Sequence, residues 1–188
     1  MAKKKRSRYK HVGGKPCIEV KVKSDRQLFD ARDPSPFRER DLDDDFVEYY
    51  LSSAREFSFH TDLKLIIHID EEIETLTNDS IKAGIYDFFQ YKIDLQKREL
   101  KSYIKRAQYF LVVGLIILFI CLYLANLVPE VGILGIFKEG LVIFGWVSLW
   151  KPIELVLFDW EPLYANLKLF RKLLGTEIEI IRKQILKN

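Results

Sequence analysis

The chain has 188 residues, of which 48% are hydrophobic, 13% aromatic and 30% charged, and its formal net charge is +3. This length allows one ordinary domain, or a membrane hairpin with a modest soluble part, and it excludes two large domains. A net charge so close to zero does not indicate a nucleic-acid partner. The two cysteines stand in a charged segment and in the most apolar segment, which argues against a disulfide framework.

The first segment, residues 1–14, is basic and begins MAKKKRSRYK. Polar residues follow it rather than an apolar run, so we predict no secretory signal peptide and expect the first membrane helix to act as its own insertion signal. Tyr9 alone is not the aromatic pattern of a nucleic-acid platform. We therefore expect a solvated tail that helps to keep the N-terminus inside, and no nucleic acid among the partners.

The next segment predicts strands and helices by its hydrophobic periodicity. Apolar and polar residues alternate in Cys17–Val22 and in Leu63–Ile69, which favours two strands. Between them, apolar residues at helical spacing predict an amphipathic helix over Asp41–Phe57, with several aspartates at its start. A second helix is expected to begin near Asn78–Ser80 and to continue unbroken from Ile81 to Val128, so that a stalk runs into the first apolar span.

Two apolar stretches follow. Tyr109–Val128 contains no charged residue, and its length matches the roughly 20 residues that cross a bilayer. For the second span we prefer Gly140–Phe158, which places Lys138 and Glu139 at the outer surface and leaves a short connection before it. The alternative, Val131–Trp150, would place those two charged residues near the bilayer centre.

Aromatic and basic residues predict the orientation of this hairpin. Trp146, Trp150 and Trp160 are expected to be interfacial anchors. Basic residues precede the first span and follow the second, whereas the connection carries only two Glu and one Lys. By the positive-inside rule, the tip of the hairpin faces outward and both termini are cytoplasmic.

After the second span, a helix is predicted over Leu163–Leu174, with Gly175 as its stop and a third strand at Thr176–Ile181. We expect this strand to return to the sheet of the first two, because two strands on one helix would be marginal.

The predicted fold is therefore α+β, with a small cytoplasmic domain of about three strands and flanking helices that a two-helix transmembrane hairpin interrupts. The expected parts are the basic tail 1–14, a cytoplasmic region 15–107 that ends in the stalk helix, the hairpin 108–160, and a cytoplasmic helix and strand in 161–188.

Lys151 and Glu154 are the most suggestive polar pair in the apolar region. They are three residues apart and can pair on a helix, and Pro152 between them is expected to kink that helix. Ionisable groups inside membranes are often functional. Both a structural pair at the membrane boundary and a part of an ion or proton pathway are open hypotheses.

A divalent-metal site is a further hypothesis, built from the acidic run 39–45 with His60 and His68. Acidic residues at a helix start explain this run better, because the run lacks the spacing of a known calcium loop. We find no nucleophile motif, Gly-rich phosphate loop or His-Glu-x-x-His pattern. We accordingly predict no enzyme, no catalytic residue, no cofactor and no metal site.

Three segments carry a resemblance to a family: DPSPFRERDLDDD (Asp33–Asp45), SSARE (Ser52–Glu56) and GWVSLWKPIELVLFDW (Gly145–Trp160). With them the chain resembles an uncharacterised family of small prokaryotic two-span membrane proteins. The resemblance implies a multi-pass protein of the prokaryotic inner membrane, and it implies no activity.

From these observations we expect a membrane scaffold or accessory subunit that presents a cytoplasmic α+β module for protein association. Its expected partners are the lipid bilayer and either further copies of itself or another membrane protein. The alternative is a small channel or transporter subunit built from several copies, lined by Lys151 and Glu154.

Overall fold

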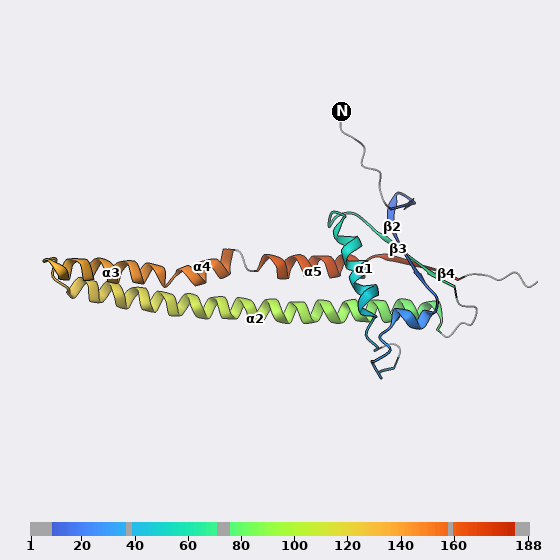
Figure 1. The fold of residues 1–188 in the computed structure, drawn as a ribbon, viewed down its shortest axis with the longest axis horizontal. Helices are drawn as coiled ribbons and strands as arrows, with labels where there is room; N and C mark the ends of the chain where they lie inside the picture. The colour runs from blue at the N-terminus through green and yellow to red at the C-terminus, as the bar shows by residue number, and fades with distance from the viewer. Residues whose placement is uncertain (1–8, 37–38, 71–75, 158–159, 183–188) are drawn as a thin grey trace, which may run out of the picture. The chain divides into compact units, whose positions relative to one another are not determined.

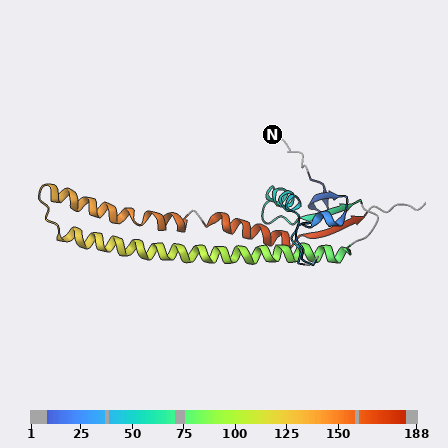
Figure 2. The ribbon, with the colours of Figure 1, turned by 60° about the horizontal axis from the view of Figure 1, so that its bottom comes forward.

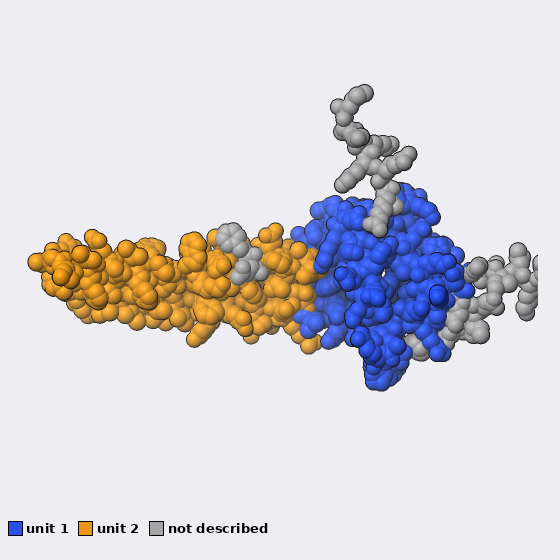
Figure 3. All heavy atoms as spheres, viewed as in Figure 1, with its two compact units in different colours: residues 1–95, 167–188 blue, residues 96–166 orange. Residues whose placement is uncertain are grey.

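A computed structural model describes residues 9–36, 39–70, 76–157 and 160–182. The chain forms two compact units, coloured separately in Figure 3. Unit 1 comprises residues 1–95 and 167–188, and unit 2 comprises residues 96–166. The architecture is mixed α+β, with the sheet in unit 1 and only helices among the described residues of unit 2.

Unit 1 contains a four-stranded sheet in the order β1-β2-β3-β4 (Figure 1). β2 (Lys15–Val22), β3 (Lys64–Ile69) and β4 (Glu177–Arg182) run parallel. The last strand pairs with β3, so that Leu65 lies opposite Ile178. The predicted return of the C-terminal strand to the sheet is therefore confirmed.

A fourth strand was not predicted. β1 (His11–Val12) pairs antiparallel with the start of β2, and the two residues between them, Gly13 and Gly14, have φ angles of 61° and 80°. Positive φ at both central residues is the conformation of a tight hairpin turn, which glycine adopts at no steric cost. Of the predicted basic tail, His11 and Val12 therefore belong to the sheet and Gly13 and Gly14 to its hairpin turn, and residues 1–8 lie outside the described residues.

Helices cover the face of the sheet that carries Leu65, Ile67 and Ile69. They are the 3₁₀-helix η1 (Asp25–Leu28), α1 (Asp44–Arg55), the first part of α2 (Asn78–Leu127) and the last part of α5 (Glu161–Leu174). The core is built from buried residues of all these elements: Ile18, Leu28, Phe46, Tyr50, Ala54, Ile67, Ile81, Ile85, Phe89, Leu169 and Leu173. Burial of this apolar face accounts for the periodicity that predicted the elements.

α1 begins three residues later than predicted. Leu42 is held in a β-bridge with Phe29, and Asp43 Oδ1 accepts a hydrogen bond from Phe46 N at 3.1 Å. Asp43 is therefore the N-cap of the helix, and it satisfies one of the free amides of the first turn. The bridge closes the loop between residues 30 and 41.

A buried aspartate connects three elements that are far apart in the sequence. Asp25 is fully buried, and its Oδ2 accepts a hydrogen bond from Leu76 N at 2.8 Å and lies 3.6 Å from the guanidinium of Arg182. Arg182 also donates to Leu76 O and to Asn78 Oδ1. These contacts hold η1, the segment before α2 and the end of β4 together in unit 1.

Unit 2 is a helical hairpin, whose first arm is the second part of α2 and whose second arm consists of the two helices α3 (Ile133–Val147) and α4 (Trp150–Leu157). The second part of α2 runs antiparallel to α3 and α4 in both ribbon views (Figures 1 and 2). By length and hydropathy, two helical stretches of the described chain could cross a membrane, one in α2 and one within Ile133–Leu174. This agrees with the predicted number of spans.

The second arm differs from the prediction of one helix over Gly140–Phe158. α3 already begins at Ile133, so the connection between the arms is shorter than expected, and the helix is interrupted between Val147 and Trp150. The interruption precedes Pro152, which has no N–H to donate to the carbonyl of Ser148 four residues earlier. Phe158 lies outside the described residues.

Candidate functional site

Lys151 and Glu154 form an ion pair on α4, with 3.0 Å between Lys151 Nζ and Glu154 Oε2. Their side chains are 58% and 42% exposed. The pair therefore lies on the outer surface of unit 2 rather than between its helices. In water, an ion pair with this exposure would add little stability. Its contribution therefore depends on whether water, lipid or another chain surrounds it.

Pro152 and Leu155 each follow one of the two charged residues by one position, and both are buried. They form the face of α4 that neighbours the ion pair. The Pro152 ring lies 3.4 Å from the position that a Cβ at Gly114 would take, so it packs directly on α2. The carbonyl of Leu155 accepts a hydrogen bond from the Tyr103 hydroxyl at 3.4 Å. α4 thus presents its apolar face to α2 and its ion pair outward.

The two arms approach closely at two glycines that our sequence reasoning overlooked. A Cβ at Gly114 would lie 3.0 Å from Ser148 O, and a Cβ at Gly145 would lie 3.1 Å from Cys121 Cβ. Small residues allow helix backbones to approach in this way inside membranes. Glycines within two apolar stretches were the signal that could have identified this contact.

Ser148 stands at the interruption of the second arm and joins the arms. Its Oγ lies 2.6 Å from Gly145 O and 3.1 Å from Gly114 O, so its single proton can be donated to either carbonyl. At the interruption Leu149 N donates to Trp146 O rather than to Gly145 O, and the Ser148 hydroxyl can bond the Gly145 carbonyl instead.

The three tryptophans of the hairpin are all exposed on unit 2. Trp146 belongs to α3 and Trp150 begins α4, while Trp160 precedes α5 and its ring centroid lies 5.7 Å from that of Tyr164. They are the predicted interfacial anchors, and their depth in a membrane stays a prediction. At the other end of the hairpin, Lys138 pairs with Glu130.

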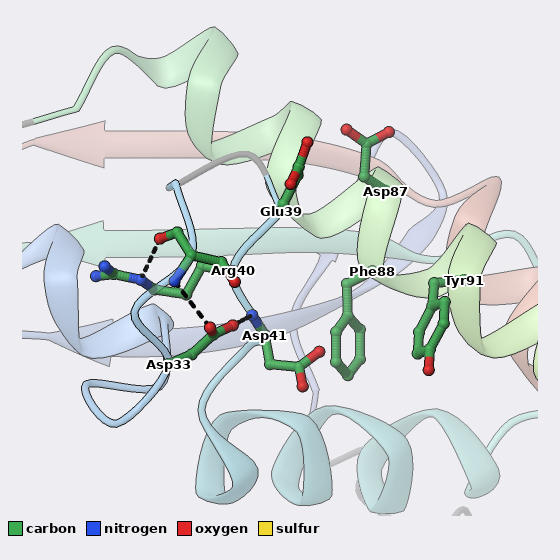
Figure 4. A pocket seen from close by; sticks show the side chains of 8 residues that line it. Asp33, Glu39, Arg40, Asp41, Asp87, Phe88 and Tyr91 are labelled. Atoms are coloured by element: carbon green, nitrogen blue, oxygen red, sulfur yellow. Dashed lines mark hydrogen bonds between the residues drawn. The ribbon is translucent and has the colours of Figure 1, made fainter.

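Unit 1 carries a pocket of about 590 Å³ beside the loop of residues 30–41 (Figure 4). Asp33 organises the loop, because its carboxylate accepts hydrogen bonds from Ser35 N at 2.9 Å and from Asp41 N at 2.8 Å. These two bonds hold the pKa of Asp33 below its usual value. Phe88 and Tyr91 of α2 line the other wall. The Asp33 side chain therefore has a structural role, because its hydrogen bonds close the loop.

The metal hypothesis finds no support in the geometry of the described residues. They contain no group of three or more His, Cys, Asp and Glu side chains that could hold a metal ion. Within the acidic run, Asp43 caps α1 and Asp44 pairs with Arg32 at 3.3 Å. His68 lies in β3, on the strand face opposite Leu65 and Ile67, and His60 lies in the loop before that strand.

Comparisons with protein-family models, with curated proteins and with solved structures find no match for this chain. The resemblance to small two-span membrane proteins therefore stays a prediction.

Proposed function

We propose that the chain is a two-span membrane protein that presents the α+β module of unit 1 at the inner face of a prokaryotic cell membrane, as a scaffold or accessory subunit. One observation carries the proposal: the outer surface of unit 2 is apolar on both arms. Large hydrophobic residues are exposed along it, among them Ile116, Phe119, Tyr123, Ile133, Ile136, Ile143, Phe144 and Val147. An exposed apolar surface of this extent is typical of a region that contacts lipid or another protein chain.

The helical hairpin also satisfies what a bilayer demands of a spanning segment. Within α2, α3 and α4 the backbone hydrogen bonds are made inside each helix, and at the interruption Ser148 contacts backbone carbonyls of both arms. The charge-free part of α2 matches the thickness of the hydrocarbon core. Basic flanks at the side of the termini favour an inward position for unit 1.

Association with a second chain is part of the proposal, because the Lys151–Glu154 pair faces outward. An ion pair that faces hydrocarbon is costly, and intramembrane charges in proteins usually face a bundle interior. Contact with another copy, or with a foreign membrane protein, would remove the pair from lipid. We then expect polar groups on the partner's surface to contact the Lys151–Glu154 pair.

The test is the mass and composition of the particle after extraction in mild detergent. We expect a particle larger than the 22.2 kDa chain, and we expect the double substitution Lys151→Ala/Glu154→Ala to shift it toward the monomer. The control removes the ion pair at the tip, Glu130→Ala/Lys138→Ala, and should leave the particle unchanged. A monomeric wild type, or an equal shift by both doubles, would contradict the proposal.

The exposed pair also favours a second candidate, a small channel or transporter subunit. Several copies could arrange Lys151 and Glu154 around a shared pathway, whereas a single hairpin is closed by the contacts at Gly114 and Gly145. This candidate requires a pure homo-oligomer and ion flux in liposomes that Glu154→Ala reduces. Flux that is unaffected by this change would remove Glu154 from the pathway.

A further inference from the structure

We propose that unit 2 binds one anionic phospholipid, with an acyl chain in an apolar groove between α2 and the α4–α5 segment and the headgroup at Lys101 and Lys105. This inference rests on the proposed membrane insertion. It adds a specific lipid site to a hairpin that would otherwise be only an anchor.

The groove has a volume of about 520 Å³, within the roughly 300–1,000 Å³ of typical ligand pockets. One wall is a stripe of α2 with helical spacing, which includes Leu100, Ile104 and Leu111, and the other wall includes Leu155 and Trp160. The lining is almost entirely apolar, with Gln108 as its one amide side chain. Its chemistry suits a hydrocarbon chain rather than a polar solute.

The position of the groove along α2 points to a lipid. The charge-free stretch of the helix begins at Tyr109, and the groove extends on both sides of it, from Leu100 to Leu111. Tyr164 and Trp160 at the other wall are aromatic residues of the kind found at the level of lipid headgroups. The groove thus extends from the predicted interface into the predicted hydrocarbon region.

Two unpaired cations at the rim specify an anionic headgroup. Lys101 and Lys105 are exposed and form no ion pair with any residue that the structure describes. They precede Ile104 and Gln108 by three residues, and residues three apart are neighbours on a helix surface. Lysine side chains at this depth can extend toward phosphate while their methylenes cover apolar surface.

The experiment measures quenching of Trp160 fluorescence by lipids with brominated acyl chains. The chain has three tryptophans, so Trp146→Phe/Trp150→Phe leaves Trp160 as the single reporter at the groove. The protein is reconstituted in vesicles of phosphatidylcholine that contain a small, equal fraction of brominated phosphatidylglycerol or brominated phosphatidylcholine. We expect stronger quenching by the anionic lipid. The ratio of the apparent affinities for phosphatidylglycerol and phosphatidylcholine should fall about fivefold for each lysine replaced by Gln.

A charge-matched control comes from the same helix. Arg98→Gln removes an exposed cation that has no groove-lining residue three or four positions away, and it should keep the preference that Lys101→Gln weakens. Equal quenching by the two lipids, or equal losses in Arg98→Gln and Lys101→Gln, would overturn the lipid site.

A second reporter separates failure of the lipid site from failure of membrane insertion. Trp150→Phe/Trp160→Phe leaves Trp146, in the apolar second arm, as the only tryptophan. Quenching of Trp146 without lipid preference at Trp160 would overturn the lipid site alone. If neither residue is quenched, the hairpin is not in the bilayer, and both proposals fall.

Discussion

At the scale of single residues, two glycines determine how closely the arms of unit 2 can pack. Gly114 lies against the carbonyl of Ser148 and the Leu149 side chain, at 3.0 and 3.1 Å from a hypothetical Cβ. Because the nearest of these atoms belongs to the backbone, it cannot move aside cheaply. Gly140 in α3 is a natural contrast, since a Cβ there would meet no atom within 4 Å.

We predict that Gly114→Ala destabilises the hairpin by about 1–3 kcal/mol, the usual cost of overpacking. Gly140→Ala should be neutral or stabilising by up to about 1 kcal/mol, because alanine is the better helix former. Thermal unfolding of both variants in the same detergent provides the comparison. Equal effects of the two substitutions would mean that the arms do not pack at Gly114.

At the scale of elements, Lys64 joins the strands of the sheet. Its Nζ lies 3.1 Å from a carboxylate oxygen of Glu177 and 2.9 Å from one of Glu179, and Lys15 contacts Glu177 at 3.3 Å. These carboxylates raise the pKa of Lys64, and the two lysines lower the pKa of Glu177. The cluster thus holds β4 beside β3 on the sheet face away from the helices.

This cluster predicts a pH-dependent effect of Lys64→Met. The raised pKa of Lys64 gives stability that is fully present below the ordinary value of 10.5 and is lost as the pH rises through the higher folded value. The lowered pKa of Glu177 gives stability that is present above 4.5 and is lost as the pH falls through the lower folded value. Lys64→Met should therefore lower the unfolding midpoint by a few degrees at pH 7.

The difference between the wild type and Lys64→Met should shrink well below pH 4.5, when Glu177 becomes protonated. The measurement is thermal unfolding at pH 7 and pH 3, followed by a far-ultraviolet signal. Lys10→Met, which removes the exposed pair with Glu19, is the control and should have a smaller effect. A difference that persists unchanged at pH 3 would show that the ion pairs are not its cause.

Hydrophobic periodicity was sufficient to predict the main elements of unit 1 from the sequence. The alternation around Leu65 and Ile67 and the helical stripe around Phe46 and Tyr50 reflect burial on one face of the sheet, which local patterns report directly. β1 was not predicted, because two residues are too short for any periodicity. Only the turn glycines Gly13 and Gly14 mark it.

The second arm was harder to predict, because its interruption depends on tertiary contacts. Pro152 indicated a kink in the sequence, but the helix is interrupted before Trp150, where the carbonyl of Ser148 loses its usual donor. The close approach of Gly114 to this carbonyl is a property of two segments far apart in the sequence. No local pattern places one opposite the other.

The outward direction of the Lys151–Glu154 pair could not be predicted for the same reason. Their spacing allowed the pair itself to be foreseen, and the structure places Nζ 3.0 Å from Oε2. Which face of the helix meets α2 depends on Pro152 and Leu155, which are buried on the neighbouring face. The structure thus places the pair where another chain could contact it.

At the scale of the whole molecule, the chain combines a water-compatible unit with an apolar one. Unit 1 buries its apolar residues in a core, whereas unit 2 exposes many of them. This division explains why charged and apolar residues are both abundant in one short chain. The central claim is that the apolar unit lies in a bilayer, with its tip outside and unit 1 inside.

Labelling of single cysteines with a membrane-impermeant maleimide in sealed spheroplasts tests this claim most directly. The two native cysteines are buried and are replaced by serine, and Val131→Cys at the tip or Glu48→Cys on the exposed face of α1 is then introduced. We predict labelling of Val131→Cys in sealed spheroplasts and labelling of Glu48→Cys only after lysis. Labelling of Glu48→Cys before lysis, or protection of Val131→Cys until lysis, would contradict the proposed membrane topology.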